Sequence, residues 1–230
     1  MLFNEALVAS FDSGSLNQDL FEKLATQYQS QSLNPMLGMA KLYQQQVRQL
    51  FFSPKLDAFR IYPVIPRFLY AGEIPSSVLD DELKSKINIL FEFGVTHIIN
   101  LTEENETNFK GVPLRPYIEQ ASHYYNEQGK QITCLRFPIR DLDIPTLSEM
   151  HTILNTLENI IHNGGCVYVH CWGGIGRTGT VIGCFLIQHE LVNPEKAIPY
   201  IAFLKRNTNI WNRNSPETEE QSRFVTLWRK

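Results

Sequence analysis

A cysteine and an arginine bracket a glycine-rich segment, Cys171 to Arg177, in the sequence HCWGGIGRTG. The segment follows the apolar run CVYVH, so it is expected to leave a buried strand and enter the first turn of a helix. Its three glycines let the backbone curl, so that successive N–H groups point inward and form a cradle for an anion. Aligned N–H dipoles and a nearby arginine favour the thiolate form of a cysteine over the thiol. The segment therefore predicts a sulfur nucleophile that faces a bound phosphoryl group.

Neighbouring side chains extend this chemistry. Arg177 can bind two non-bridging phosphate oxygens through its planar guanidinium, whereas a lysine would present a single point charge. Thr178 places a hydroxyl where it can assist the departure of the thiolate from a phosphocysteine. His170 is expected to orient the loop by hydrogen bonding rather than to act as a base.

The sequence HCWGGIGRTG matches the pattern HCxxGxxRTG, and the chain therefore resembles the cysteine-dependent protein tyrosine phosphatases. The chain length and the segment PRFLYAGEIP are similar to the dual-specificity branch of that superfamily, and the resemblance covers residues 62–228. It implies that Cys171 forms a phosphocysteine intermediate, that Arg177 binds phosphate, and that no metal or organic cofactor is needed. It also implies that phosphate is bound by the backbone of the residues between them, which are Trp172, Gly173, Gly174, Ile175 and Gly176.

In this family an aspartate on a separate loop is the general acid. The segment FPIRDLDIP resembles the family pattern PIxDxxxP and gives that role to Asp141, 30 residues before Cys171. Asp143 is the alternative, and we expect it to be a structural carboxylate of the loop or of the next helix start.

A second family feature is present in altered form. Larger tyrosine phosphatases carry a QTxxQ turn that orients the hydrolytic water, and the corresponding turn here reads ETEEQ, ending at Gln221. Gln221 is thus a candidate for positioning water. The alternative is that the segment only begins a helix, with Ser215 and Glu217 as capping residues.

These residues predict a phosphomonoester hydrolase that acts on phosphotyrosine, with phosphoserine and phosphothreonine as further substrates. The alternative enzyme is a phosphatase of phosphoinositides or inositol phosphates. Relatives with those substrates often carry lysines inside the loop, whereas the variable positions from Trp172 to Ile175 are all uncharged here. A phosphate-binding scaffold without turnover is the third hypothesis, and the joint presence of nucleophile, arginine and acid disfavours it.

Composition excludes other classes of protein. The chain has 230 residues, 43% of them hydrophobic and 20% charged, as is typical of a globular protein. A formal net charge of −3 argues against a general nucleic-acid binder. The four cysteines form no CxxC pair and the histidines show no ligand spacing, so no metal site is predicted. No signal-peptide pattern and no apolar run of about 20 residues is found, so we expect a cytoplasmic location without a membrane span.

Strand-like and helix-like segments alternate from residue 62 onward. This order predicts an α/β fold with a mainly parallel central sheet flanked by helices. Apolar and β-branched runs predict strands at 67–71, 96–101, 132–137 and 166–170. Periodicity and cap residues predict helices at 77–93, after Thr146 or Ser148, from about Arg177, from Asn193 and from Ser215.

The first residues of the chain differ from the rest. Gln and Ser are frequent there, and apolar residues recur at helical spacing in 20–28 and 36–50. We therefore predict a helical N-terminal extension at 1–61 and a dual-specificity-type phosphatase domain at 62–230. The extension is expected to pack on that domain, and the alternative is a helix that binds a partner or a membrane surface.

Overall fold

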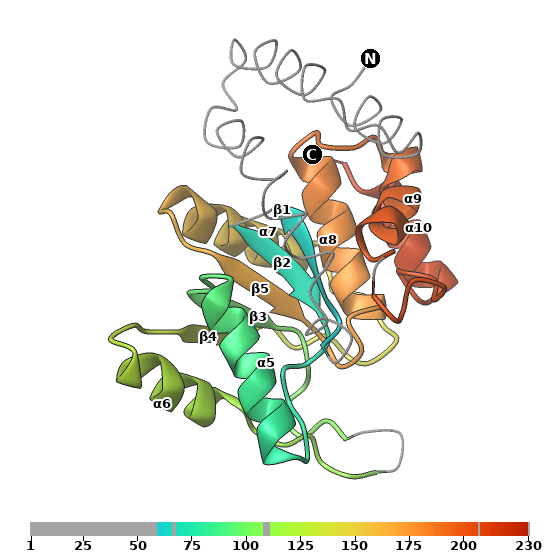
Figure 1. Ribbon diagram of the computed structural model, residues 1–230. Helices are drawn as coiled ribbons and strands as arrows, with labels where there is room; N and C mark the ends of the chain where they lie inside the picture. Colours follow the sequence, from blue (N-terminus) through green and yellow to red (C-terminus); the bar gives the residue numbers. More distant parts are fainter. Residues whose placement is uncertain (1–58, 66–67, 108–110, 207, 230) are drawn as a thin grey trace.

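A five-stranded sheet in the order β1-β2-β5-β3-β4 forms the centre of the computed structural model, which describes residues 59–65, 68–107, 111–206 and 208–229 (Figure 1). The strands are β1 (Ile61–Ile65), β2 (Leu69–Gly72), β3 (His97–Asn100), β4 (Thr133–Arg136) and β5 (Val167–His170). Apart from residues 59–61, the predicted N-terminal extension lies outside the described residues.

The pairs β2–β5, β5–β3 and β3–β4 are parallel, which confirms the predicted mainly parallel sheet. β1 adds an antiparallel edge that the sequence analysis did not predict, because a proline interrupts its apolar run. Pro63 pairs with Tyr70, and the register shifts between Pro63 and Ile65. An edge strand tolerates a proline because only one side of the strand must supply ladder hydrogen bonds.

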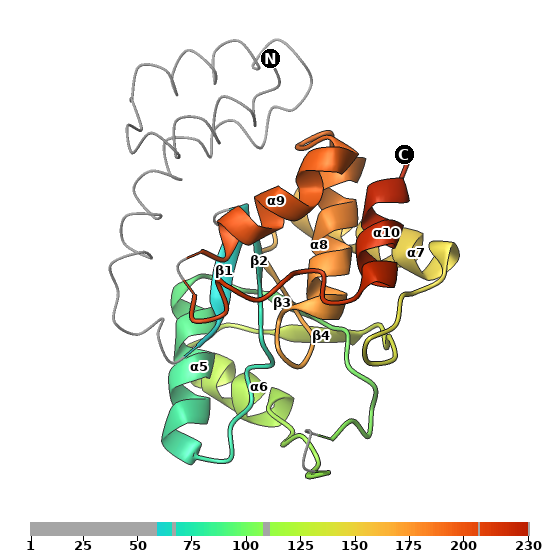
Figure 2. The same ribbon diagram turned by 90° about the vertical axis from the view of Figure 1, so that its right-hand side faces the viewer.

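Helices cover both faces of the sheet, as expected from the alternating sequence (Figures 1 and 2). On one face lie α5 (Asp80–Glu92) and α6 (Ile118–Glu127). On the other lie α7 (Leu147–His162), α8 (Gly176–Gln188), α9 (Pro194–Leu204) and α10 (Glu219–Leu227).

Successive side chains of β5 point to opposite faces of the sheet, and the core accordingly consists of two clusters, one on each face. Val167 and Val169 join the cluster beneath α7 and α8, whereas Tyr168 joins the cluster beneath α5 and α6. All of these side chains are fully buried, so β5 is the central strand on which both layers rest. A loop that follows β5 therefore starts from a rigidly held backbone.

Helix starts agree with the predictions in part. Of the two caps considered for α7, the structure selects Thr146, which forms a capping box with Glu149. The last helix begins later than predicted, since Thr218 caps α10 and Ser215 does not. Helix α6 was not predicted, because Tyr117 stands at its N-cap position without any side-chain cap. None of the helices that the structure describes is both long enough and apolar enough to cross a bilayer.

The carboxyl ends of the parallel strands meet at one edge of the sheet. Asn100 of β3 and His170 of β5 are in register there, and the Leu101 N–H donates to the His170 carbonyl at 2.9 Å. The loops that follow β3, β4 and β5 consequently lie at the same edge, where open α/β sheets bind their ligands. The predicted reactive residues all belong to these loops or to helices that begin beside them.

Candidate active site

The glycine-rich loop connects the carboxyl end of β5 to the first turn of α8, as predicted. Cys171 follows directly on β5 and is 3% exposed, and α8 begins at Gly176. Gly174 has a φ of +72°, and a Cβ there would lie 2.3 Å from the Gly72 carbonyl carbon. Only glycine satisfies both the left-handed backbone and this close approach of β2. The Ile74 N–H donates to the Trp172 carbonyl at 3.0 Å and ties the loop to the segment after β2.

Arg177 is buried in the first turn of α8, with only 1% of its surface exposed. Its Nη1 and Nη2 donate to the two carboxylate oxygens of Glu106 at 2.6 and 2.7 Å, and Nη1 also donates to the Ile139 carbonyl at 3.0 Å. Burial by itself lowers the pKa of Arg177, but hydrogen bonds to Glu106 and the charges of Cys171, Glu106 and Asp141 raise it above its ordinary value. The guanidinium is thus a permanent positive charge in a fixed orientation.

Glu106 was missed by the sequence reasoning. It lies in the loop after β3, and its Oε2 also accepts from the Glu103 N–H at 3.2 Å. An acidic run after the strand beside β5 was the available signal, because that position faces the same sheet edge.

The two candidate acids have different surroundings. Asp141 Oδ1 lies 2.9 Å from Arg177 Nη2, and its side chain is 60% exposed. Asp143 Oδ1 instead accepts from the Ile144 N–H at 2.8 Å. The Asp141 carboxylate therefore contacts Arg177 and is exposed to solvent, whereas the Asp143 carboxylate stabilises the turn before α7.

His170 lies beneath the loop, fully buried. Burial lowers its pKa to about 3, so the imidazole is neutral near pH 7. Nδ1 is 2.9 Å from the Cys171 carbonyl, which can only accept, so Nδ1 carries the proton. Nε2 then accepts from the Tyr117 hydroxyl at 2.6 Å. This chain of hydrogen bonds fits the predicted orienting role, and Tyr117 is a second residue that the sequence reasoning missed.

Thr178 is fully buried beside Arg177. Its Oγ1 has no hydrogen-bond partner within the part of the chain that the structure describes. A buried hydroxyl without a partner is costly, so this atom is free to bond to a group that enters or forms in the site.

The C-terminal turn also contacts the loop. Ser215 Oγ donates to the Ile175 carbonyl at 2.7 Å, so Ser215 holds the phosphate loop instead of capping a helix. Gln221 is buried, with Oε1 accepting from the N–H groups of Glu217 and Thr218 and Nε2 donating to the Asp143 carbonyl. The helix cap is Thr218, so the prediction that Ser215 and Glu217 fill that role is wrong.

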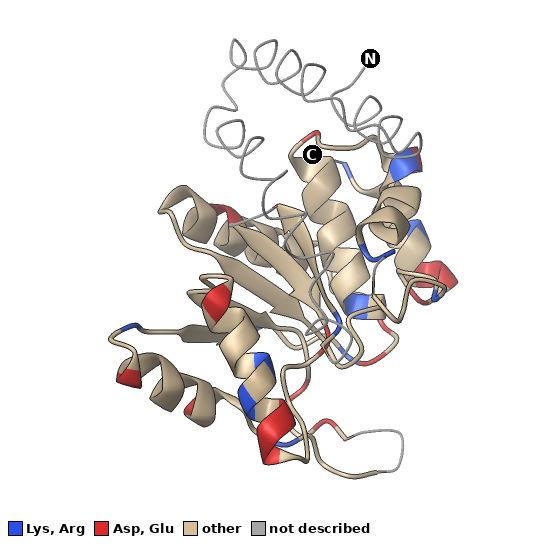
Figure 3. Ribbon diagram, viewed as in Figure 1, with Lys and Arg blue, Asp and Glu red and all other residues tan. Residues whose placement is uncertain are grey.

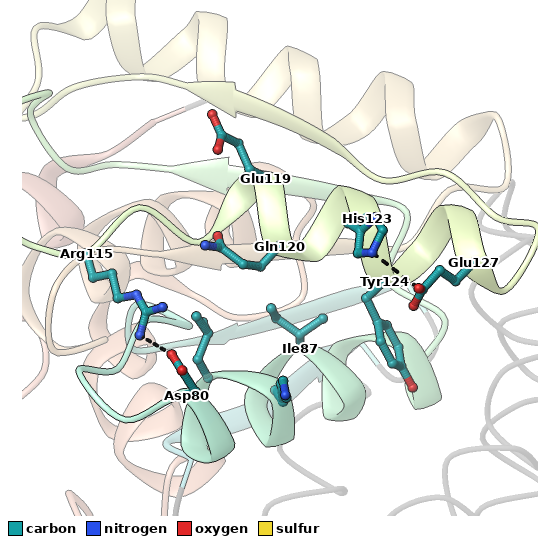
Figure 4. Close-up of a pocket in the computed structure, with 10 residues that line it drawn as sticks. Asp80, Ile87, Arg115, Glu119, Gln120, His123, Tyr124 and Glu127 are labelled. Carbon is teal, nitrogen blue, oxygen red and sulfur yellow. Dashed lines mark ion pairs between the residues drawn. The ribbon is translucent and has the colours of Figure 1, made fainter.

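Charge is mixed over the molecule, and acidic residues lie on the loops beside the basic start of α8 (Figure 3). No group of three His, Cys, Asp or Glu side chains suited to a metal occurs among the described residues. A separate groove of about 540 Å³ lies between α5 and α6 (Figure 4). Ion pairs of Arg115 with Asp80 and of His123 with Glu127 lie along it.

Comparisons with known proteins show what this chain is similar to in sequence. The family model described as "Polymorphic toxin system, DSP-PTPase phosphatase" matches residues 80–191. Phosphatidylglycerophosphate phosphatase PTPMT1 of Arabidopsis thaliana is 29% identical over 155 residues, which are 66% of this chain and 40% of that protein. Phosphatidylglycerophosphatase and protein-tyrosine phosphatase 1 of Mus musculus is 29% identical over 123 residues, 53% of this chain and 58% of that one. The chain thus spans less than two thirds of the length of both relatives.

Solved structures show the same fold. A kinase associated phosphatase superposes with a TM-score of 0.52 at 21% identity, covering 68% of this chain and 83% of that one. PTPMT1 in complex with PI(5)P gives a TM-score of 0.50 at 23% identity, with coverage of 71% and 94%.

Proposed function

We propose that this chain, which belongs to the dual-specificity-like branch of the cysteine-dependent protein tyrosine phosphatase superfamily, removes phosphate from phosphotyrosine in proteins. Phosphoserine and phosphothreonine are further substrates in this proposal. The observation that carries it is the Arg177 guanidinium, buried at the loop that begins with Cys171 and in contact with Asp141 at 2.9 Å. Nucleophile, anion-binding arginine and proton donor thus belong to one site.

In the first step, the Cys171 thiolate attacks phosphorus, so that an S–P bond forms while the P–O bond to the substrate breaks. Asp141 gives its proton to the departing oxygen, which leaves as a neutral hydroxyl group. Arg177 and the N–H groups from Trp172 to Gly176 hold the oxygens on which negative charge accumulates. Nη2 of Arg177 contacts the Asp141 carboxylate in the free structure, so the proposal requires the entering phosphate to displace this ion pair. Asp141, no longer beside the cation that favours its ionised form, then takes up a proton from solvent and turns toward the leaving group.

In the second step, water attacks the phosphocysteine and the S–P bond breaks. Asp141, now ionised, accepts a proton from that water. The sulfur leaves as a thiolate, and the partnerless Thr178 hydroxyl is available to donate a hydrogen bond to it. No step draws on a metal ion or an organic cofactor, and the four cysteines in the described part of the chain are free thiols.

The uncharged loop supports a protein substrate. Positions Trp172 to Ile175 supply no side-chain cation for a second phosphate, as a polyphosphorylated inositol would require. One observation favours a second candidate, a phospholipid monoester: relatives named above act on phosphatidylglycerophosphate according to their names. A non-catalytic phosphate-binding scaffold has no comparable support, since nucleophile, arginine and acid are all present.

A substrate panel tests the proposal. Phosphate release from phosphotyrosine, phosphoserine and phosphothreonine peptides is compared with release from phosphatidylglycerophosphate and phosphoinositide vesicles. Cys171→Ser is the control for contaminating activity. We expect the highest kcat/KM with phosphotyrosine peptides, and a higher kcat/KM with vesicles contradicts the protein-substrate assignment.

A further inference from the structure

Gln221 connects the start of α10 to two other parts of the site. Its Nε2 donates to the Asp143 carbonyl at 3.0 Å, across 78 residues of sequence. Its Oε1 accepts from the N–H groups of Glu217 and Thr218 at 3.1 and 3.2 Å. A Cβ on Gly176 would lie 2.9 Å from Oε1, so the amide is packed against the phosphate loop. The side chain is completely buried.

The carbonyl that Gln221 holds belongs to the turn that carries Asp141. In that turn the Asp143 N–H donates to the Arg140 carbonyl at 3.1 Å, and Leu142 has a φ of +63°. A left-handed conformation at a leucine is unfavourable, and such a residue persists only where its surroundings hold it. The hydrogen bond from Gln221 is one such constraint, since it fixes the carbonyl of Asp143, the residue that follows Leu142.

We propose that Gln221 is a positioning residue for the proton donor: through the Asp143 carbonyl it holds the turn that presents Asp141 at the phosphate loop. This inference rests on the proposed function. It differs from the water-orienting role considered from the sequence, because Oε1 and one amide hydrogen are already bonded within the protein.

The two roles differ in the chemical steps that they affect. Positioning of Asp141 affects both steps, and its effect on the first step, in which the leaving oxygen must be protonated, grows as the leaving group becomes more basic. Orientation of water affects only hydrolysis of the phosphocysteine. Loss of the first role lowers kcat/KM, whereas loss of the second lowers kcat, leaves kcat/KM unchanged and makes the intermediate accumulate as a burst.

Gln221→Glu is the decisive variant, because it keeps an acceptor for the Glu217 and Thr218 N–H groups but cannot donate to the Asp143 carbonyl when ionised. Thr218→Val is the matched control, since it removes the Thr218 hydroxyl that accepts from the Gln221 backbone N–H but removes no partner of the Gln221 side-chain amide. Each protein is assayed with aryl phosphates ranging from an activated ester to one whose phenol has a pKa of about 10, like tyrosine. Pre-steady-state release of the phenol reports any burst.

For Gln221→Glu we expect kcat/KM to fall about tenfold on the tyrosine-like ester, part of the 10²–10⁴ that a general acid contributes. The loss on the activated ester should be clearly smaller. Thr218→Val should lower the melting temperature without changing the dependence on the leaving group. Added to Asp141→Asn, Gln221→Glu should have no further effect, because the acid it positions is gone.

A burst with unchanged kcat/KM in Gln221→Glu overturns the inference in favour of water orientation, and an equal loss on all esters overturns it as well. If Gln221→Glu fails to fold, Gln221→Leu replaces it. Leucine lacks the donor and also the acceptor for the Glu217 and Thr218 N–H groups, so the leaving-group dependence of this variant is the quantity compared with that of Thr218→Val. A wild-type chain that turns over none of the esters refutes the proposed function instead, so the two failures are distinguishable.

Discussion

Replacing Glu106 with glutamine tests how far Arg177, which we propose binds phosphate, depends on a residue outside its own loop. Both carboxylate oxygens of Glu106 accept from the Arg177 guanidinium, at 2.6 and 2.7 Å. Glutamine keeps the size of the side chain but offers one oxygen, so one bond is lost and the other becomes a bond to a neutral acceptor. The Glu106 side chain is 10% exposed, so little water is available to replace the lost acceptor.

A hydrogen bond to a charged group contributes about 1.5–3 kcal/mol, so we expect Glu106→Gln to weaken the interaction with the Arg177 guanidinium by about 2 kcal/mol. About 1.4 kcal/mol corresponds to a tenfold change in rate. If the transition state needs the same orientation of the Arg177 guanidinium, kcat/KM should therefore fall roughly 30-fold. The free energy of unfolding should fall by a similar amount, because the buried guanidinium loses its partner in the free protein too.

Steady-state kinetics with a phosphotyrosine peptide and urea unfolding measure the two effects. Glu104→Gln, an exposed change of the same charge in the same loop, is the matched control and should alter neither quantity by much. The reasoning is refuted if Glu106→Gln stays within about twofold of the wild type in kcat/KM, because the pair would then have no role in presenting Arg177.

Three further predictions follow from the site. Asp141→Asn should lower phosphotyrosine turnover by about 10²–10⁴ and Asp143→Asn by less than about tenfold, and the opposite ranking would exchange their roles. Burial lowers the pKa of His170 to about 3, so below about pH 6.5 the unfolded chain binds a proton at this residue and the folded chain does not. The free energy of unfolding should therefore decrease as the pH is lowered from about 6.5. Urea unfolding between pH 5 and 6.5 should show a flatter pH dependence in His170→Gln; an unchanged slope contradicts the assignment. Alkylation of Cys171 should be slowed by bound phosphate, and turnover should survive a metal chelator; an alkylation rate that saturating phosphate does not change contradicts the assignment of the anion site to this loop.

The phosphate loop could be predicted because its determinants are contiguous. The residues from Cys171 to Arg177 carry the glycines of the turn, and the apolar run before them defines the strand that holds it. Asp141 could be proposed as the acid for a similar reason, since a short local pattern surrounds it. The parallel sheet followed from the alternation of buried strands with helices.

Residues that act through the tertiary fold could not be predicted in this way. Glu106 is 71 residues from Arg177, and Tyr117 is 53 residues from His170, so nothing local to either marks the pairing. Strand β1 was missed because a strand that contains a proline, here Pro63, can be assigned to a sheet edge only once its neighbour is known. The capping role was given to Ser215 because that residue precedes a proline, but its hydroxyl is used by the Ile175 carbonyl instead.

Trapping of the phosphocysteine tests the central claim most directly. The chain is mixed with a phosphotyrosine peptide, quenched within the first turnover, digested, and analysed by mass spectrometry for phosphate on sulfur. The account predicts one phosphate on Cys171 of the wild type, and neither this adduct nor turnover in Cys171→Ser. Phosphate on another residue, or sustained turnover by Cys171→Ser, would contradict it.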